Sequence, residues 1–506
     1  MDYSGVDALR LLSMIAEAID DVDYHAIGLQ ENPEGFLAAC DSNAAHATWA
    51  ILPHILLEKV FSFLRLKDRY HASLVCRHWN DVFYSPSIWR KLVMNSTTFT
   101  HKRMTPFKGY WLELNNHKVL KWLQSVGSFL VTLQIEPISD FYNLFAFIKI
   151  LNEFIESNRE DISMDSLVNF YFTFACESRD KTEVSIYGTG GRLLQELARL
   201  LKNLKGLEEL KMNHLLLDLK DAPGVLDYLV TNCGTTLRQV ELRNFTKELY
   251  PLFIVGMFRN LHTVIISPQH LSNDIVRGLI SSKVTNLHIV QDQYSEEAYF
   301  IDVDVWKAAA ERMPVLNVHL SARGATPMDI MWQEGAPVRS VLYTTKFSQV
   351  HSLAIDTITV LYNTSLQVYG HLDLPRYHDS RSFTGRCDEN LVNLIRTCSK
   401  IHTIIIRQKI STSTLIILAR EGHALKHLFV RRNGIIKRCD WQRTLTWDDD
   451  YYWTMRRAAH SYQETFDEVS RCLGYAWQPL TDKQFKELRS QYCNINCSTQ
   501  GGFDTS

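Results

Sequence analysis

The cysteines and histidines of this chain are the residues whose spacing could support catalysis. Cys76 lies two residues before His78, and a cysteine beside a histidine can form a pair of nucleophile and base. We expect both residues on one helix, where positions i and i+2 face different directions. This geometry argues against a catalytic pair, and Cys76 is more typical of a core residue.

Two other patterns could bind a metal ion or a phosphate. Cys493 and Cys497 lack the second cysteine pair or the matching histidines that zinc sites use. The cluster Gly188-Thr189-Gly190-Gly191 could bind phosphate only if a helix N-terminus faced the ligand, and we interpret it as a turn. We therefore predict no metal and no cofactor.

The sequence also lacks the motifs of common enzyme classes. It contains no Gly-x-x-x-x-Gly-Lys loop, no His-Glu-x-x-His helix and no Gly-x-Ser-x-Gly turn. We predict that the protein is not an enzyme. The alternative, a hydrolase or transferase, would require a pocket with convergent titratable groups within residues 120–430.

Composition sets the broad class of protein. A chain of 506 residues with 46% hydrophobic residues is too long for one core, and its net charge of −2 argues against a broadly basic surface for nucleic acid or membrane. The ten cysteines follow no repeating spacing, which indicates reduced thiols. We find no secretory signal and no window of about 20 apolar residues that could span a membrane. We place the protein in the cytoplasm, the nucleus or both.

The stretch from Trp49 to Val93 is dense in apolar residues and punctuated by helix signals. Pro53 suits the first turn of a helix, which would carry one apolar stripe of Leu56, Leu57, Val60, Phe61 and Leu64. Asp68 is the expected N-cap of a second helix, which would carry Ala72, Val75, Cys76 and Trp79. Ser85 and Pro86 would start a third. Three helices this short bury too little surface alone, so we expect a partner protein to cover them.

This stretch resembles the F-box family. The matching positions are Leu52-Pro53, Val60-Phe61, Leu64, Asp68, Leu74-Val75-Cys76, Trp79 and Trp89. The chain departs from the family at His54 and Ile55, where acidic residues are common. The resemblance implies docking on the Skp-type adaptor of a cullin-RING ubiquitin ligase, and through it contact with the cullin and the RING protein. The adaptor-binding residues that it implies are Leu52, Pro53, Leu56, Val60, Phe61, Leu64, Leu74, Val75, Cys76, Trp79 and Trp89. Of these, we expect Val60, Val75 and Cys76 only to hold the helices together.

The rest of the chain repeats a short apolar pattern, apolar-x-x-apolar-x-apolar. The ten copies start at Leu130, Leu167, Leu207, Leu237, Leu261, Val284, Val315, Val338, Ile401 and Leu425. From residue 207 to residue 338 their starts are 30, 24, 23, 31 and 23 residues apart, close to the period of leucine-rich repeats. Helical patterns lie between them at 224–229, 274–280, 303–313, 391–398 and 413–419. The gap after Val338 could be filled by Val350-Leu353-Ile355 or by Leu366-Tyr369.

We therefore predict an α/β fold: a three-helix F-box followed by an irregular leucine-rich-repeat solenoid with parallel strands inside and helices outside. The match is degenerate, because the asparagine expected three places after the pattern is replaced by Leu215, Phe245, Gln269 and Asp292. Apolar runs of this kind also occur in the buried strands of ordinary α/β proteins, which is the alternative.

A candidate substrate face follows from strand alternation. Residues between the apolar positions should point to the concave side of the repeats. They are Glu209, Lys211, Gln239, Glu241, Arg243, Asn286, His288, Asn317, His319, Arg407, His427 and Arg431. Their mixed charges select no class of ligand.

The C-terminal part has an acidic and aromatic cluster, Trp441, Trp447, Asp448-Asp449-Asp450 and Tyr451-Tyr452-Trp453, followed by a helical pattern over residues 461–473. It could be a partner surface, but we favour a cap on the last repeat, which solenoids require. The segments Ala419-Arg420-Glu421-Gly422, Leu425-Lys426 and Val469 to Trp477 resemble the F-box only protein thirty-three group.

The predicted organisation is a helical leader and linker at 1–48, with a helix over 7–20, the F-box at 49–95 and a connector at 96–128. The repeats follow at 129–432, the cap at 433–492 and a disordered tail at 493–506. The predicted function is that of a substrate-recognition subunit of the ligase, whose repeats bind an unknown target protein. The alternative is a scaffold that uses the F-box outside any ligase.

Overall fold

The computed structural model describes residues 52–105, 109–157, 164, 166–179, 184–296, 298–324, 332–349, 351–443 and 447–495. The predicted leader helix over 7–20 and residue Cys497 lie outside the described residues. The chain forms two compact units, the first comprising Met1–Ser185 and Gly190–Glu209 and the second Ile186–Thr189 and Leu210–Ser506.

The F-box segment begins with the expected helix but continues differently. Helix α5 (His54–Phe63) is followed by α6 (Leu66–Ser73), α7 (Arg77–Phe83) and the 3-10 helix η1 (Pro86–Trp89). We predicted one helix where α6 and α7 lie. The chain breaks there because the N–H groups of Leu74 and Val75 donate to carbonyls only three residues back, and Cys76 is extended with φ −157°. Asp68 lies in the first turn of α6, whose N-cap is Arg65, so the predicted cap was wrong.

The first unit continues directly from the F-box into strand–helix repeats. Strand β1 (Lys91–Met94) pairs in parallel with β4 (Thr132–Ile135), which pairs with β5 (Asn169–Thr173). Helices α8 (Asn116–Val126), α9 (Phe141–Ser157) and α10 (Gly191–Asn203) accompany them, with η2 (Gly127–Phe129) and the short strands β6 (Glu177–Arg179) and β7 (Val184–Ile186). Where we predicted a connector, the chain forms α8 and an antiparallel hairpin of β2 (Thr100–Thr105) and β3 (Gly109–Leu114).

The strands of the second unit follow one another in parallel. They are β8 (Glu209–Asn213), β9 (Gln239–Leu242), β10 (Thr263–Ile266), β11 (Asn286–Gln291), β12 (Asn317–Arg323), β13 (Val338–Thr344), β14 (Val368–His371), β15 (Thr403–Ile406) and β17 (His427–Val430). Within the described residues, the hydrogen-bonded order of the large sheet is β1-β4-β5-β8-β9-β10-β11-β12-β13-β14-β15-β17, twelve strands in chain order. Each of the ten predicted apolar patterns overlaps one strand of this sheet. The predicted α/β, solenoid-like fold is therefore confirmed.

The long gap in the pattern is filled by β14, which begins two residues after Leu366. The competing segment with Leu353 and Ile355 belongs to α14 (Ser352–Tyr362). A residue without a side chain is needed in β14, because a Cβ at Gly370 would lie 2.6 Å from the Cβ of Ile405 on β15. This repeat is harder to recognise in the sequence because His371 stands at the last apolar position of the pattern.

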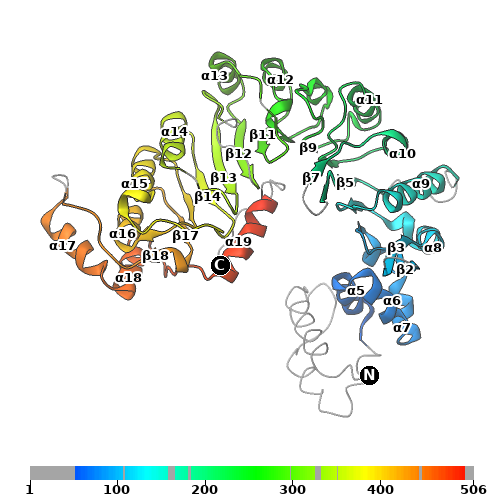
Figure 1. The fold of residues 1–506 in the computed structure, drawn as a ribbon, viewed down its shortest axis with the longest axis horizontal. Coiled ribbons are helices and arrows are strands. Elements are labelled where there is room, and N and C mark those ends of the chain that lie inside the picture. The colour runs from blue at the N-terminus through cyan, green and yellow to red at the C-terminus, as the bar shows by residue number, and fades with distance from the viewer. Residues whose placement is uncertain are drawn as a thin grey trace, which may run out of the picture. The chain divides into compact units, whose positions relative to one another are not determined.

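Helices of the second unit line one side of its strands (Figure 1). They are α11 (Ala222–Cys233), α12 (Asn273–Leu279), α13 (Val303–Arg312), α14, α15 (Asp388–Thr397) and α16 (Thr412–Glu421), with the 3-10 helices η3 (Phe253–Met257), η4 (Pro268–His270) and η6 (Phe383–Gly385) between them. Apart from Val315, which is 61% exposed, the apolar residues of the repeating pattern are almost completely buried; Leu287 and Ile289 of β11, for example, have no exposed surface.

An asparagine does bridge successive repeats, although not at the position where we expected it. Asn244, two residues after β9, is completely buried with a positive φ of 47°. Its Nδ2 donates to Asp292 Oδ1 at 2.8 Å, and its Oδ1 accepts from Ser267 Oγ at 2.9 Å and Gln269 Nε2 at 3.2 Å. One amide thus satisfies polar groups of two following repeats, and Gln269 and Asp292 are its partners and not its replacements.

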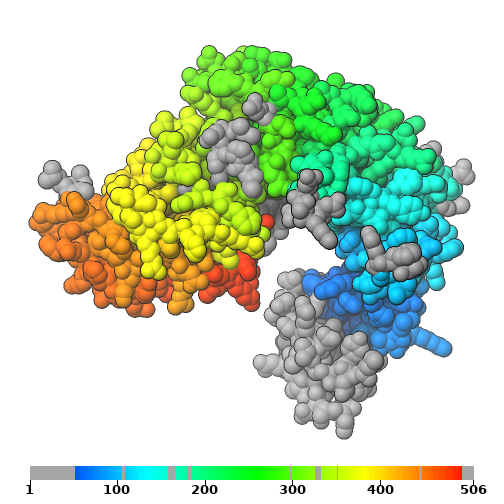
Figure 2. All heavy atoms as spheres, in the orientation of Figure 1, coloured from blue at the N-terminus to red at the C-terminus, as the bar shows by residue number. Residues whose placement is uncertain are grey.

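The C-terminal helices pack on two different surfaces of the last repeats. Helices α17 (Asp449–Ala458) and α18 (Tyr462–Leu473) pack on α16, with Ser461 as the side-chain N-cap of α18. Helix α19 (Asp482–Ile495) lies on the opposite side of the strands (Figure 1), and its last three residues belong to the predicted tail. Small strands β16 (Ile410–Ser411) and β18 (Ile435–Ile436) pair near 3-10 helix η7 (Arg432–Gly434). In space-filling view the orange C-terminal residues close directly against the last repeats (Figure 2).

Candidate interaction surfaces

The F-box segment exposes large apolar side chains that a single chain would normally bury. Leu74 and Val75, in the break between α6 and α7, are each 63% exposed. The other exposed members are Ile55, Phe63, Tyr70 and Tyr84. Two of these exposed residues could have been predicted from the sequence. Ile55 and Phe63 lie outside the apolar stripe of α5, so their side chains are not needed to pack the F-box helices together. A cluster of exposed apolar residues indicates a protein-binding site.

The structure divides the eleven predicted adaptor-binding residues into two groups. Those that are buried and hold the F-box helices together are Leu52, Val60, Phe61, Trp79 and Trp89. Those with accessible surface are Pro53, Leu56, Leu64, Leu74, Val75 and Cys76. We expected Val75 and Cys76 only to hold the helices together, and both are therefore corrected to the group with accessible surface. Trp89 also packs beyond the F-box, with its ring 6.1 Å from that of Trp122 on α8.

The Cys76 and His78 pair has no catalytic geometry. Cys76 is the N-cap residue of α7, while His78 bonds through Nε2 to the carbonyl of Leu52 at 2.9 Å. The glycine cluster is also structural, because Thr189 N donates to Leu215 O at 2.7 Å and a Cβ at Gly188 would collide with Leu216 O. Within the described residues, no cluster of three potential metal ligands occurs.

The strand side opposite the helices is mainly polar over β8 to β12, although Ile265 and Val290 also lie on it. Glu241 is only 4% exposed, and its carboxylate accepts from Arg243 Nε at 2.7 Å and Asn213 Nδ2 at 3.1 Å, with Lys211 Nζ at 3.8 Å. Arg243 also lies 3.6 Å from Asp292. Burial would raise the pKa of Glu241, but the cations, Arg243 foremost, outweigh it and lower this pKa to about 2. Glu241 is therefore a fixed anion that orients two cations.

Histidines continue this polar half of the face. The rings of His288 and His319 stack at 4.4 Å with an interplanar angle of 14°, and His319 Nδ1 lies 2.8 Å from Ser340 Oγ. Burial lowers the pKa of both, with that of His319 at about 4. Other predicted face residues here are Glu209, which accepts from Tyr171, Asn317, which accepts from Arg339, and the buried Gln239 and Asn286.

The same side of the strands becomes apolar over β13 to β17, and α19 covers it. Leu342, Leu372 and Ile405 form a buried cluster with Phe485, Leu488 and Tyr492 of α19. Arg431 pairs with Asp482 at 2.8 Å, and Arg489 pairs with Asp373 at 2.8 Å. The chain's own C-terminal helix therefore occupies this half of the predicted substrate face.

Three residues that we predicted on the substrate face lie in this covered half. Arg407 is completely buried and donates to the carbonyls of Asp373 and Ser348 at 3.1 and 2.8 Å. Arg431 is paired with α19, and the ring of His427 stacks on Phe429 at 5.9 Å. Arg407 is thus a structural residue, which corrects our expectation. Alternation along a strand indicates which side a residue faces but not what covers that side.

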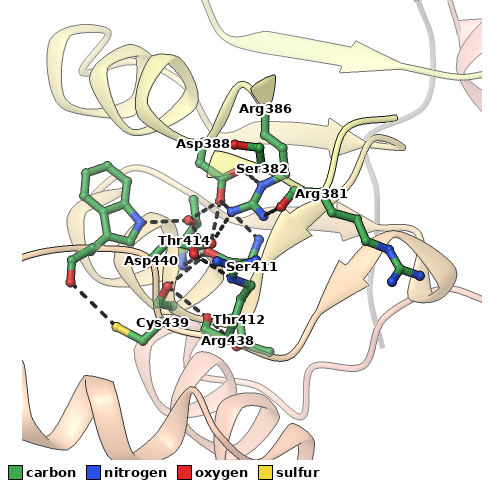
Figure 3. Close-up of polar contacts among 12 residues, drawn as sticks. Arg381, Ser382, Arg386, Asp388, Ser411, Thr412, Thr414, Arg438, Cys439 and Asp440 are labelled. Atoms are coloured by element: carbon green, nitrogen blue, oxygen red, sulfur yellow. Dashed lines mark hydrogen bonds and ion pairs between the residues drawn. The ribbon is translucent and has the colours of Figure 1, made fainter. Parts of the chain in front are cut away.

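A buried polar cluster joins α15, α16 and the segment before α17 (Figure 3). Arg386 binds Asp388 through Nε at 2.9 Å and also pairs with Asp440. Asp388 accepts from Ser411 N at 3.1 Å and Thr414 Oγ1 at 2.6 Å. These convergent charges are the arrangement that an enzyme would require, but each carboxylate is matched by donors in a closed core. The cluster is therefore structural: its buried ion pairs and hydrogen bonds hold α15, α16 and the segment before α17 together. We call it the Arg386–Asp388 clasp.

A shallow cavity of about 390 Å³ lies between α11 and η3. Its lining is mainly apolar, including Leu226, Phe253 and Met257, with Asp227 and Tyr250 as its titratable members. These two do not form the convergent set of groups that our hydrolase or transferase alternative requires. Within the described residues, no helix is long and apolar enough to cross a membrane.

Comparison with known proteins defines the class of the N-terminal domain. Residues 49–95 match the F-box-like family, in agreement with α5 to η1. The chain therefore contains an F-box-like domain followed by parallel strand–helix repeats.

The relatives combine an F-box with leucine-rich repeats. The chain is 23% identical over 290 residues to F-box/LRR-repeat protein 21 of sheep (Ovis aries), covering 56% of this chain and 61% of the relative. It is 46% identical to the bovine (Bos taurus) protein of the same name over 55 residues, 11% of this chain and 13% of the relative. The chain thus spans less than two thirds of these relatives.

The match to F-box only protein 33 of Homo sapiens is shorter. It reaches 35% identity over 65 residues, 13% of this chain and 11% of the relative. The specific group that we predicted from the C-terminal motifs is not confirmed.

Proposed function

We propose that this protein is a substrate-recognition subunit of a cullin-RING ubiquitin ligase. Its F-box-like domain docks on a Skp-type adaptor, through which the cullin and the RING protein are recruited. The observation that supports this most is the exposure of Leu74 and Val75, both 63%, inside the segment that matches the F-box-like family. Binding would remove this apolar surface from water, at about 25 cal/mol per Å².

The substrate would bind the polar half of the strand face, over β8 to β12. Lys211, Arg243, Asn213 and His214 come from neighbouring repeats and are held by Glu241, Asp292 and Asn244. Side chains positioned in advance lose little conformational entropy on binding. Catalysis would come from holding the target near the ubiquitin-conjugating enzyme, which raises its effective concentration, and not from a residue of this chain.

A cell-based capture experiment tests this function. Wild type and a variant with both Leu74→Asp and Val75→Asp are purified from cells under proteasome inhibition. We expect the adaptor and cullin to be recovered only with wild type, while target proteins remain bound to the variant and accumulate. Deletion of the whole F-box is unsuitable, because β1 pairs with β4 and Trp89 packs on Trp122.

The scaffold alternative gives a different result in the same experiment. If the adaptor is recovered with wild type but the cullin and RING protein are absent and no bound protein accumulates, the protein acts outside a ligase. Recovery of adaptor and cullin with the double variant would contradict the proposed docking site.

A further inference from the structure

The hairpin of β2 and β3 is exposed on both faces. Residues 101–104 of β2 are all exposed, with Met104 at 78%, and on β3 Tyr110 and Trp111 are 53% and 54% exposed. A two-stranded hairpin of this kind is only marginally stable in water without a third strand or a packed face. Its exposed aromatic and methionine side chains indicate a surface made for a partner.

The base of the hairpin is fixed to the F-box end of the first unit. Asn115 N donates to Phe99 O at 2.8 Å, and the ring of Phe99 lies 5.7 Å from Trp122, which packs in turn on Trp89 at 6.1 Å. The hairpin is therefore presented from a rigid base.

The two faces of the hairpin differ in charge. The cross-strand pairs Arg103↔Trp111 and His101↔Glu113 share one face, where Glu113 accepts from Arg103 at 2.9 Å and partly balances the cations. The pairs Lys102↔Leu112 and Met104↔Tyr110 share the other face, which carries a cation and apolar groups but no acidic residue among these four. This second face is amphipathic and positive.

The two edges of the hairpin differ, because the edge of β3 is partly occupied by another side chain and the edge of β2 is the more open one along these described residues. Asn143 of α9 binds the outer edge of β3, donating from Nδ2 to Leu112 O at 2.8 Å and accepting from Leu114 N at 2.9 Å. Residues 112 and 114 therefore point their backbone groups outward, and in an antiparallel ladder so do their cross-strand partners. On β2, the backbone N–H and C=O of Lys102 therefore point away from β3. Because every second residue of a strand has this orientation, the N–H and C=O of Met104 also point away from β3.

We propose that the β2 edge binds an extended, acidic segment of a partner protein, which adds a third strand to the hairpin. The segment would carry an acidic and an apolar residue two positions apart, because residues i and i+2 of a strand share one face and these two would meet Lys102 and Met104 on the amphipathic face. Backbone hydrogen bonds supply affinity in this mode, and alternate side chains supply specificity. A nucleic acid fits less well, because Lys102 lies over the ring of Tyr110 at 4.4 Å and Arg103 over that of Trp111 at 6.0 Å, which covers the ring faces that bases would stack on.

Binding of a defined peptide tests the proposal on the full chain. The probe is a fluorescein-labelled ten-residue peptide in which glutamate and valine follow each other at every second position and serine fills the positions between them, and fluorescence anisotropy reports its affinity. We expect Lys102→Glu to weaken binding at least tenfold. Met104→Pro, which removes an outward N–H without breaking the ladder, should weaken binding more than Met104→Ala, which removes only the side chain.

The matched control is Lys121→Glu on α8, an exposed charge reversal outside the hairpin, which should leave affinity unchanged. Circular dichroism confirms that each variant is folded. Equal binding of a lysine–valine peptide, or unchanged binding by Lys102→Glu and Met104→Pro, would overturn the proposal. Preferential binding of single-stranded RNA or of anionic phosphatidylserine vesicles at this hairpin would overturn it as well.

Discussion

At the scale of residues, the buried cluster around Arg386 brings opposite charges together. Asp388 is completely buried and faces Arg386, whose side chain is 1% exposed. Because its Oδ1 also accepts from Ser411 and Thr414, this carboxylate ties α15 to α16. Sequence alone could not identify it, since Thr414, which donates to it, lies 26 positions further along the chain.

Asp388→Ala tests this clasp. The change leaves the guanidinium of Arg386 buried with one carboxylate, and removing one partner of a buried pair costs about 3–5 kcal/mol. We expect a loss of this size in the free energy of unfolding, measured by denaturant titration. Arg396→Ala, which breaks the more exposed pair with Glu421, should cost no more than about 1 kcal/mol. Equal losses in the two variants would contradict the clasp.

Buried histidines give a second prediction, about pH. Burial lowers the pKa of His270 from 6.5 to about 4, and its Nε2 accepts from Phe245 N at 3.0 Å, a bond that requires the unprotonated nitrogen. The unfolded chain therefore binds a proton that the folded chain does not. The free energy of unfolding should therefore be highest above pH 6.5. Between pH 6.5 and pH 4 it should fall by about 1.4 kcal/mol per pH unit for each such histidine.

Denaturant midpoints measured between pH 7 and pH 4.5 check this dependence. His270→Gln keeps a donor and an acceptor but does not titrate, so its pH dependence should be shallower than that of wild type. The exposed His262→Gln is the control and should keep the full slope. A steeper slope in His270→Gln would show that the histidine is not buried in its neutral form.

At the scale of elements, local sequence patterns predicted where the strands lie, but they did not predict which elements pack against those strands. Every predicted apolar pattern proved to overlap a strand, because alternate apolar residues must face the helices. The second F-box helix was wrong because the pattern does not show where Leu74 and Val75 leave the helix. Helix α19 and its docking on β13 to β17 could not be predicted either, since no local signal states which distant surface a helix covers.

A substitution at Phe485 tests how much the docking of α19 contributes to the free energy of unfolding. Its side chain is completely buried in the cluster with Leu342 and Ile405. Phe485→Ala should cost about 3–5 kcal/mol of unfolding free energy, as expected for a large core residue. Lys486→Ala, the next residue and exposed, should be within about 0.5 kcal/mol of wild type. A small effect of Phe485→Ala would mean that α19 is not stably docked in solution.

At the scale of the molecule, the chain separates its tasks between regions. The F-box-like domain has exposed apolar side chains, the strands from β8 to β12 have a polar face, and the strands from β13 to β17 are covered by α19. Sequence indicated the first region from its resemblance and the second from strand alternation. It could not show that Leu52, Phe61 and Trp79 are core residues, whereas Leu74 and Val75 are surface. The distinction depends on how the short helices pack.

The most direct test of the central claim is the affinity of the full chain for a purified Skp-type adaptor, measured by isothermal titration calorimetry. The double variant Leu74→Asp with Val75→Asp removes exposed apolar surface without touching the core. Met257→Asp, at a residue 64% exposed on η3, is the matched control. We predict tight binding by wild type and by the control, and a loss of at least a hundredfold in the double variant. Wild type that does not bind the adaptor, or a double variant that binds as wild type does, would contradict the account.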